Sequence, residues 1–122
     1  MAGIHGITQA KRERKTTIKL LTKELTKKLP AMRTTERLEA ADKVAVAKFF
    51  HPAGRGTWFA VEFDGVDEFF GFVVSPLGAD CDEWGYFSLQ ELESVRVRGL
   101  GIERDRWFKP QTMREALPVH FG

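Results

Sequence analysis

The chain has 122 residues, of which 43% are hydrophobic and 30% are charged, values typical of a globular domain rather than a disordered or fibrous chain. This length predicts one domain whose core is large enough to fold without disulfides. The single cysteine, Cys81, cannot form an internal disulfide, and no apolar stretch approaches the roughly 20 residues of a membrane-spanning helix. We therefore expect a cytoplasmic protein that is neither secreted nor inserted in a membrane.

The net charge of +2 conceals a segregation of charge along the chain. Residues 1–33 hold nine basic against two acidic residues, residues 34–93 hold four against twelve, and residues 94–122 hold six against three. If the two basic ends fold onto one side, they form a positive surface that attracts phosphate or an acidic protein. The alternative is that oppositely charged segments pair across the fold and neutralise one another.

A basic arm and an amphipathic helix are the first predicted elements. Residues 1–15 combine a basic cluster with little apolar content, so we expect a flexible arm, followed by a single compact domain over 16–122. Thr17 is a good helix N-cap, and apolar residues recur at three- and four-residue steps from there to Pro30. This pattern predicts an amphipathic helix over 17–29 that packs its apolar side on the rest of the fold. Its apolar positions are Ile18, Leu21, Leu25 and Leu29.

Alternating apolar residues bounded by turn signals predict a series of strands in the remainder of the chain. The Asp64-Gly65 pair is a strong hairpin signal because both residues tolerate positive φ at low steric cost. The strands on either side of this pair should therefore be antiparallel neighbours. The predicted strands span residues 43–50, 57–63, 69–74, 84–87, 95–98 and 102–108.

Two short helices are expected in the C-terminal half. Ser88 and Glu91 have the spacing of a capping box, and Thr112 and Glu115 have the same spacing, so each pair should open a helix. Pro118 should end the second helix. The predicted fold class is therefore α+β: an antiparallel sheet of four to six strands packed against the N-terminal amphipathic helix, with two short helices in the C-terminal half.

The sequence predicts no metal site, no cofactor and no catalytic residue. The histidines lack the spacing of a zinc site, and the acidic clusters lack the alternating, glycine-centred pattern of a calcium loop. Cys81 lies among carboxylates, which disfavour a reactive thiolate. Glu103 and Asp105, taken with Glu62 and Asp64, are the most enzyme-like group, so a metal-dependent nuclease is one alternative hypothesis.

Nucleic-acid binding is the stronger alternative, because basic residues occur beside aromatic rings and in a basic arm. Lysine and arginine would follow the phosphate backbone while bases stack on a tryptophan. Such a protein should bind DNA or RNA with an affinity that falls steeply as salt is added. The candidate residues are Lys11, Arg12, Arg14, Lys15, Lys19, Lys23, Lys27, Arg96, Arg98, Arg104, Arg106 and Trp107.

Five aromatic-rich segments follow one another in a fixed order: KFFHP, GTWFAVEFDG, EFFGFV, WGYFSLQELESV and GIERDRWFKP. In this order they resemble a small bacterial family known only as domain of unknown function 2958, whose members occur mainly on plasmids, integrative elements and phages. The resemblance covers residues 21–117. It implies an accessory protein of a mobile element, and such elements use small proteins to regulate their transfer or to block host defences. It supplies no catalytic residues.

We therefore predict a non-catalytic protein of a mobile genetic element that acts by macromolecular binding, with inhibition of a host defence system such as restriction or CRISPR as its expected role. The expected partner is a protein encoded by the host or the element, which docks on exposed rings and an acidic rim. The candidate docking residues are Trp58, Trp84, Asp80, Asp82 and Glu83.

Overall fold

The computed structural model describes residues 19–122, so the basic arm predicted over 1–15 lies outside the described residues. The strands are β1 (Val44–Ala45), β2 (Ala47–Phe50), β3 (Thr57–Phe63), β4 (Glu68–Val74), β5 (Glu83–Ser88), β6 (Glu103–Arg104) and β7 (Gln111–Thr112). The helices are α2 (Lys23–Lys28), α3 (Leu89–Ser94), α4 (Met113–Ala116) and α5 (Pro118–Phe121), with short 3-10 turns at η1 (Ala40–Asp42) and η2 (Ala79–Cys81). None of these helices is long and apolar enough to cross a membrane.

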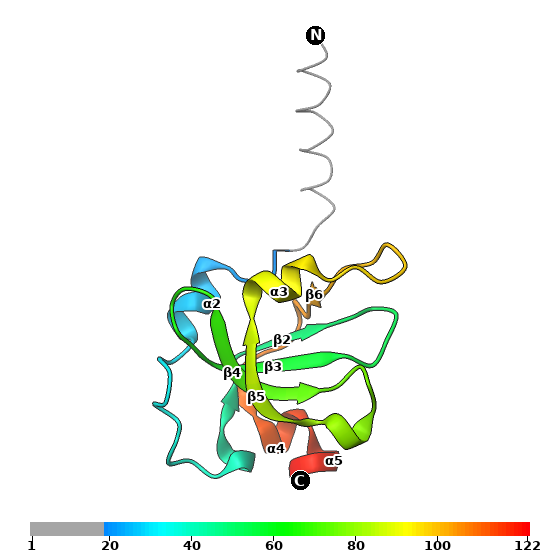
Figure 1. Ribbon diagram of the computed structural model, residues 1–122. Helices are drawn as coiled ribbons and strands as arrows, with labels where there is room; N and C mark the ends of the chain where they lie inside the picture. Colours follow the sequence, from blue (N-terminus) through cyan, green and yellow to red (C-terminus); the bar gives the residue numbers. More distant parts are fainter. Residues whose placement is uncertain (1–18) are drawn as a thin grey trace.

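The main sheet has five antiparallel strands in the order β5-β4-β3-β2-β6 (Figure 1). β1 pairs with β7 in a separate two-stranded sheet. This arrangement confirms the α+β class and the antiparallel sheet. The β3–β4 hairpin turns at Asp64-Gly65 as predicted, with Gly65 at a φ of 87°. The Asp64 carboxylate accepts the amides of Val66 and Asp67, each at 2.8 Å, so it closes the turn.

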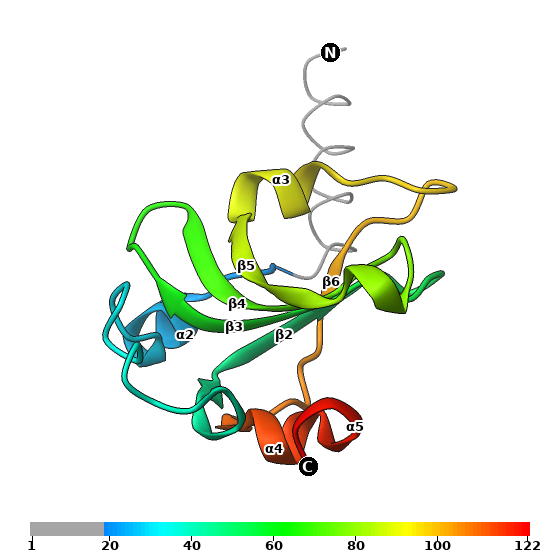
Figure 2. The same cartoon turned by 60° about the horizontal axis from the view of Figure 1, so that its bottom comes forward.

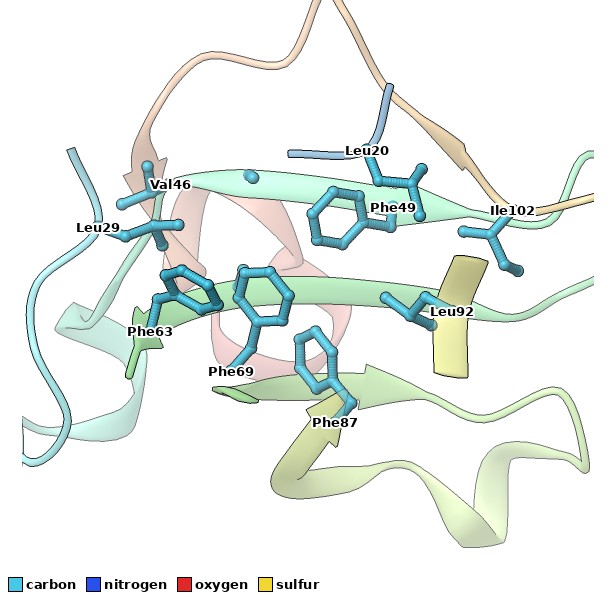
Figure 3. Close-up of a cluster of buried hydrophobic side chains, with 11 residues drawn as sticks. Leu20, Leu29, Val46, Phe49, Phe63, Phe69, Phe87, Leu92 and Ile102 are labelled. Atoms are coloured by element: carbon cyan, nitrogen blue, oxygen red, sulfur yellow. The ribbon is translucent and has the colours of Figure 1, made fainter. Parts of the chain in front are cut away.

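Helices cover both faces of the sheet, so the structure has two cores (Figure 2). The first core lies on the face covered by α3, where the rings of Phe63, Phe69 and Phe87 stack with centroids 4.6 and 5.2 Å apart (Figure 3). The second core lies on the face covered by α4 and α5 and is built on Phe59, Phe72, Met113 and Ala45. Aromatic residues fill both sides of β3 and β4, which explains why so small a chain carries ten phenylalanines.

The prediction of an amphipathic helix over 17–29 is wrong. Residues 19–22 are not helical, and α2 begins at Lys23 because the Thr22 hydroxyl accepts the Leu25 amide at 3.1 Å and caps the helix there. Thr17 and Ile18 lie outside the described residues. The apolar spacing nevertheless has a structural role, because Leu29 is buried in the first core and Leu21 and Leu25 pack against it.

The single strand predicted over 43–50 is divided in two. The ladder is interrupted at Val46, so that β1 pairs with β7 while β2 pairs with β3 and β6. The strand predicted over 95–98 is not formed. This segment instead forms a turn with one bridge between Val97 and Leu100, and Arg98 and Gly99 within the turn adopt φ angles of 56° and 79°.

Three helices, rather than two, occupy the C-terminal half. The Ser88 hydroxyl accepts the Glu91 amide and opens α3, and the capping box of Thr112 and Glu115 opens α4, both as predicted. Pro118 does not end the helical region but begins α5, because proline at a first helical position leaves no hydrogen bond unmade.

Candidate functional site

The segment over residues 103–110, called the β6 edge below, forms one side of the main sheet. Only two of its residues join the sheet: Glu103 pairs with Phe50 and Arg104 pairs with Phe49. The ladder then ends, because the Asp105 carboxylate accepts the Trp107 amide at 3.0 Å and turns the chain. The strand predicted over 102–108 is therefore much shorter than expected.

The turn after β6 is attached to the domain at both of its ends. The Asp105 amide donates to the Lys48 carbonyl oxygen at 2.9 Å, and the Lys48 ammonium lies 3.6 Å from the Asp105 carboxylate. On the other side of the turn, the Phe108 ring lies 6.0 Å from the Phe59 ring and packs on the second core. These contacts hold the backbone of residues 105–108 in place.

Two open hollows flank the β6 edge and share Arg104, Asp105 and Arg106 in their linings. The first hollow lies between α2 and the β6 edge, has a volume of about 420 Å³, and is lined by the basic residues Lys28, Arg104, Arg106 and Lys109 together with Glu24 and Asp105. The second hollow has a volume of about 570 Å³ and is lined by Lys48, His51, Arg104 and Arg106, by Glu103 and Asp105, and by the Trp107 ring. Both volumes are in the range of about 300–1,000 Å³ that ligand sites usually have.

The two basic ends of the chain meet at the first hollow. Lys28 comes from the N-terminal basic segment and pairs with Glu24 at 3.7 Å, whereas Arg104, Arg106 and Lys109 come from the C-terminal one. The last three form no ion pair with any residue between 19 and 122. The first hollow is therefore lined by more basic than acidic residues, whereas the acidic middle of the chain supplies β5 at the opposite edge of the sheet.

Trp107 is 89% exposed, more than either of the other two tryptophans. It follows the exposed Arg106, so an aromatic and a guanidinium side chain occupy adjacent positions of one turn. Such an exposed ring is unusual, because burying an aromatic side chain is strongly favourable. Its position beside unpaired cations makes the β6 edge the strongest candidate functional site among the described residues.

The remaining nucleic-acid candidates are distributed more widely. Lys19, Lys23 and Lys27 are exposed at or near α2, but they do not line either hollow. Arg96 and Arg98 are exposed in the turn before β6, where the Arg96 guanidinium donates to the carbonyl oxygens of Glu93, in α3, and Val95. The cluster of Lys11, Arg12, Arg14 and Lys15 lies outside the described residues.

Three basic residues that line the hollows, Lys28, Lys48 and Lys109, are not in the list of candidates. Lys109 lies two residues after Trp107 in the same segment. Lys28 follows helical spacing typical of a solvated face, and Lys48 occupies an alternate position in a strand, so neither pattern differs from that of ordinary surface lysines. Pairing of β2 with β6 brings Lys48 to Asp105, and docking of α2 brings Lys28 beside Arg104. Only these long-range contacts show that Lys28 and Lys48 belong to the site.

The residues predicted as a protein-docking surface do not form one exposed patch. Trp58 is half-buried against the first core, and Trp84 packs on the second core with its ring 5.5 Å from Phe72. The expectation that both rings are exposed is therefore wrong, because each face of the sheet is covered by helices. Asp80 and Glu83 are exposed, whereas the Asp82 side chain is only 2% exposed.

The carboxylates of the nuclease hypothesis do not gather at one place. Glu62 accepts hydrogen bonds from the loop at residues 33–35, and Asp64 accepts those of the hairpin turn. Glu103 and Asp105 line the second hollow. Among residues 19–122, no group of three or more histidine, cysteine, aspartate or glutamate side chains is placed to hold a metal ion.

Comparison with protein families finds a match to the family described as "Protein of unknown function (DUF2958)" over residues 20–116. This match spans most of the chain. The chain belongs to the DUF2958 family. No curated protein and no solved structure matches it. The DUF2958 match includes α2 and the whole of the β6 edge, so both hollows are made of residues within the family domain.

Asp82 connects three separate parts of this DUF2958 domain. Its carboxylate pairs with both terminal nitrogens of Arg55, at 2.7 and 2.8 Å, and it accepts the Ser75 amide at 2.7 Å. The His120 ring, from α5, lies 3.2 Å away. The hydrogen bonds from Arg55 are the main cause that holds the pKa of Asp82 well below its usual 3.8, against the opposing effect of burial. Asp82 is therefore a structural residue.

We expect Asp82→Asn to lower the thermal midpoint by several degrees at pH 7, because the substitution removes the charge that Arg55 faces. A group whose pKa is lower in the folded state stabilises the fold above its unfolded value and loses this contribution as the pH falls. The difference in thermal midpoint between wild type and Asp82→Asn should thus be largest near neutral pH and should become smaller below pH 3.8. Thermal unfolding followed from pH 7 to pH 2 measures it.

Asp80→Asn is the matched control. Asp80 lies two residues before Asp82 and is exposed, and its substitution removes the same charge. It should leave the midpoint almost unchanged across the range. A difference between wild type and Asp82→Asn that stayed constant down to pH 2 would contradict the assignment.

Proposed function

We propose that this DUF2958 protein binds nucleic acid at the β6 edge and does so without catalysing a reaction. The observation that carries the proposal is that Arg104, Arg106 and Lys109 line the first hollow together with Lys28 and have no ion-pair partner among residues 19–122. Cations that are not neutralised within the protein are available to phosphate groups.

Arginine at this position supports phosphate as the ligand group. A guanidinium group presents several N–H donors in a plane and can bind two phosphate oxygens at once. Arg104 and Arg106 alternate along the chain, and both line the two hollows, so a phosphate chain that crosses the β6 edge would contact them in succession. The N-terminal basic residues Lys11 to Lys15 precede the described chain by only a few positions and would add to the same electrostatic attraction.

Arg106→Glu should weaken the binding of a fluorescein-labelled oligonucleotide about tenfold at moderate salt, because it replaces a phosphate contact by a repulsive charge. It should also reduce the slope of log K against log salt by about one. Fluorescence anisotropy over a salt series gives both quantities.

Arg37→Glu is the matched control. Arg37 is also exposed, forms no ion pair within residues 19–122 and lines neither hollow, and its substitution gives the same change in net charge. It should have a much smaller effect. Equal losses for Arg37→Glu and Arg106→Glu would mean that net charge alone drives binding, and wild-type protein without salt-sensitive affinity would refute the proposal.

Protein docking is the second candidate function, and it is favoured by the exposed carboxylates of Asp80 and Glu83 beside the half-buried Trp84 at the β5 edge. An accessory role in a mobile element, including inhibition of a host defence system, is compatible with either kind of binding and stays a prediction. The anisotropy experiment separates the two candidates, because a protein that docks only on proteins has no affinity for the oligonucleotide.

A further inference from the structure

The Trp107 ring is displayed on a turn whose backbone is fixed. The Asp105 carboxylate holds the Trp107 amide, the Asp105 amide is bonded to Lys48 of β2, and the next residue, Phe108, packs on the second core. The ring itself remains 89% exposed. A flat apolar surface presented on a fixed backbone loses little conformational entropy when another ring stacks on it.

The nature of that second ring follows from the charges around Trp107. Arg106 is adjacent in sequence, and both Arg104 and Arg106, which form no ion pair within residues 19–122, line the same second hollow as the Trp107 ring. A ligand that fits must therefore join an aromatic plane to negative charges a few ångströms away. A nucleobase attached to its sugar-phosphate chain has this combination.

Duplex and single-stranded nucleic acids present different surfaces to a protein. In a duplex the faces of the bases are covered by neighbouring base pairs, so a protein ring can stack only on an unpaired base. A duplex also presents the phosphates of two strands over a broad surface. At the β6 edge the basic residues alternate with Glu103 and Asp105, whose carboxylates repel a broad phosphate surface.

We infer that Trp107 is a stacking platform for an unpaired base, so that the β6 edge binds single-stranded nucleic acid in preference to duplex. This inference rests on the proposed nucleic-acid function and specifies its substrate class. The recognised chemistry, an unpaired base on a phosphate chain, is shared by DNA and RNA, and Arg104 and Arg106 hold the phosphates on either side of the base.

The test compares Trp107→Ala, Trp107→Phe and wild-type protein in anisotropy titrations with a mixed-sequence DNA strand, the RNA strand of the same sequence, and the DNA duplex. Trp107→Ala should lose about tenfold in affinity for at least one single strand, the loss expected for one stacked base. Trp107→Phe should retain most of the affinity. Affinity for the duplex should be weaker in wild type and unchanged by either substitution.

Two controls keep the result interpretable. Tyr86 is 64% exposed on β5, at the other edge of the sheet. Tyr86→Ala also removes an exposed ring, and this variant should bind single strands as tightly as wild type. Because the Trp107 ring packs on so little, the thermal midpoint of Trp107→Ala should match that of wild type, which excludes misfolding as the cause of a loss.

The outcomes distinguish a failure of the stacking inference from a failure of the proposed nucleic-acid binding. If Arg106→Glu weakens binding but Trp107→Ala does not, or if wild type binds duplex as tightly as single strands at the same salt, the stacking inference is refuted and the proposed function stands. If wild type binds none of the three nucleic acids, both are refuted. Loss of affinity on Trp107→Ala in the DNA arm, the RNA arm or both supports the inference and identifies the strand.

Discussion

Gly71→Ala should lower the free energy of unfolding by more than about 3 kcal/mol, or prevent folding. Gly71 lies in the middle of β4, paired with Ala60 on one side and with Gly85 on the other. A Cβ atom at this position would lie 1.8 Å from the Phe59 carbonyl oxygen and 3.2 Å from the Ala60 Cα atom. Neither backbone atom can move away without breaking the β3–β4 ladder, so the cost is steric and cannot be relieved by a change of rotamer.

The close approach has a cause in the sheet. The register between β3 and β4 shifts between Ala60 and Glu62, so that Val61 is the extra residue of a bulge. Glycine at position 71 permits the close contact beside it. The bulge belongs to the centre of the sheet, where Val61 and Ala60 are fully buried, and its disruption would affect both cores.

Gly85→Ala is the matched control for Gly71→Ala. Gly85 is the direct partner of Gly71 on β5, but a Cβ atom there would meet no atom within 4 Å. Its substitution should change stability by no more than about 1 kcal/mol, in either direction, because alanine restricts the unfolded chain. Urea denaturation of both variants measures the difference. Similar losses of stability in the two would show that the contact with Phe59 is not the cause.

Glu62→Ala should cost about 2–4 kcal/mol of folding free energy, because it removes a buried carboxylate that accepts three hydrogen bonds from the loop at residues 33–35. Glu62 is 3% exposed. Its carboxylate accepts the Arg33 amide at 2.7 Å, the Thr35 amide at 2.9 Å and the Thr35 hydroxyl. These bonds fasten the loop that connects α2 to η1 across the sheet, and they hold Arg33 at a φ of 71°, a region that residues with a side chain usually avoid.

The charge of Glu62 adds a pH dependence to this loss. Burial raises the pKa of the Glu62 carboxyl, but the bonds from Thr35 and Arg33 together outweigh burial and hold the pKa below its usual 4.5. The contribution of the ionised Glu62 carboxylate to the free energy of folding is thus present above pH 4.5 and is lost as the pH falls.

Chemical denaturation at pH 7 and again at pH 3 tests this expectation, with Glu68→Ala as the control, since Glu68 is an exposed glutamate on the neighbouring strand β4. We expect Glu68→Ala to stay within about 0.5 kcal/mol of wild type. If Glu62→Ala is no worse than Glu68→Ala at pH 7, the loop does not depend on this carboxylate.

The two edges of the sheet explain how one small domain can separate opposite charges. Strand order places β6 and β5 at opposite edges of the sheet, with the aromatic-rich strands β4, β3 and β2 between them. Cations from the two ends of the chain converge at β6, and Asp80 and Glu83 remain exposed at β5. Strand order thus keeps the exposed Arg106 and Lys109 of the β6 edge away from these two exposed carboxylates.

Local patterns determined much of this fold. The central strands β3, β4 and β5 lie where alternation of apolar residues predicts them, within one residue at each end, and the Asp64-Gly65 turn joins the first two. The helices α3 and α4 begin where Ser88 and Thr112 supply their caps. These features depend on residues within a few positions of one another, so the necessary information is contained in short segments of sequence.

The candidate site was decided by contacts between distant segments. Sequence spacing identifies Arg104, Arg106 and Trp107 as basic and aromatic, but only the pairing of β6 with β2 and the docking of α2 place Lys28 and Lys48 beside them. In the same way, α4 and α5 cover Trp84. Alternation shows that a side chain points to one face of a strand, but whether a helix covers that face depends on where the chain returns, and that is set by packing of the whole domain.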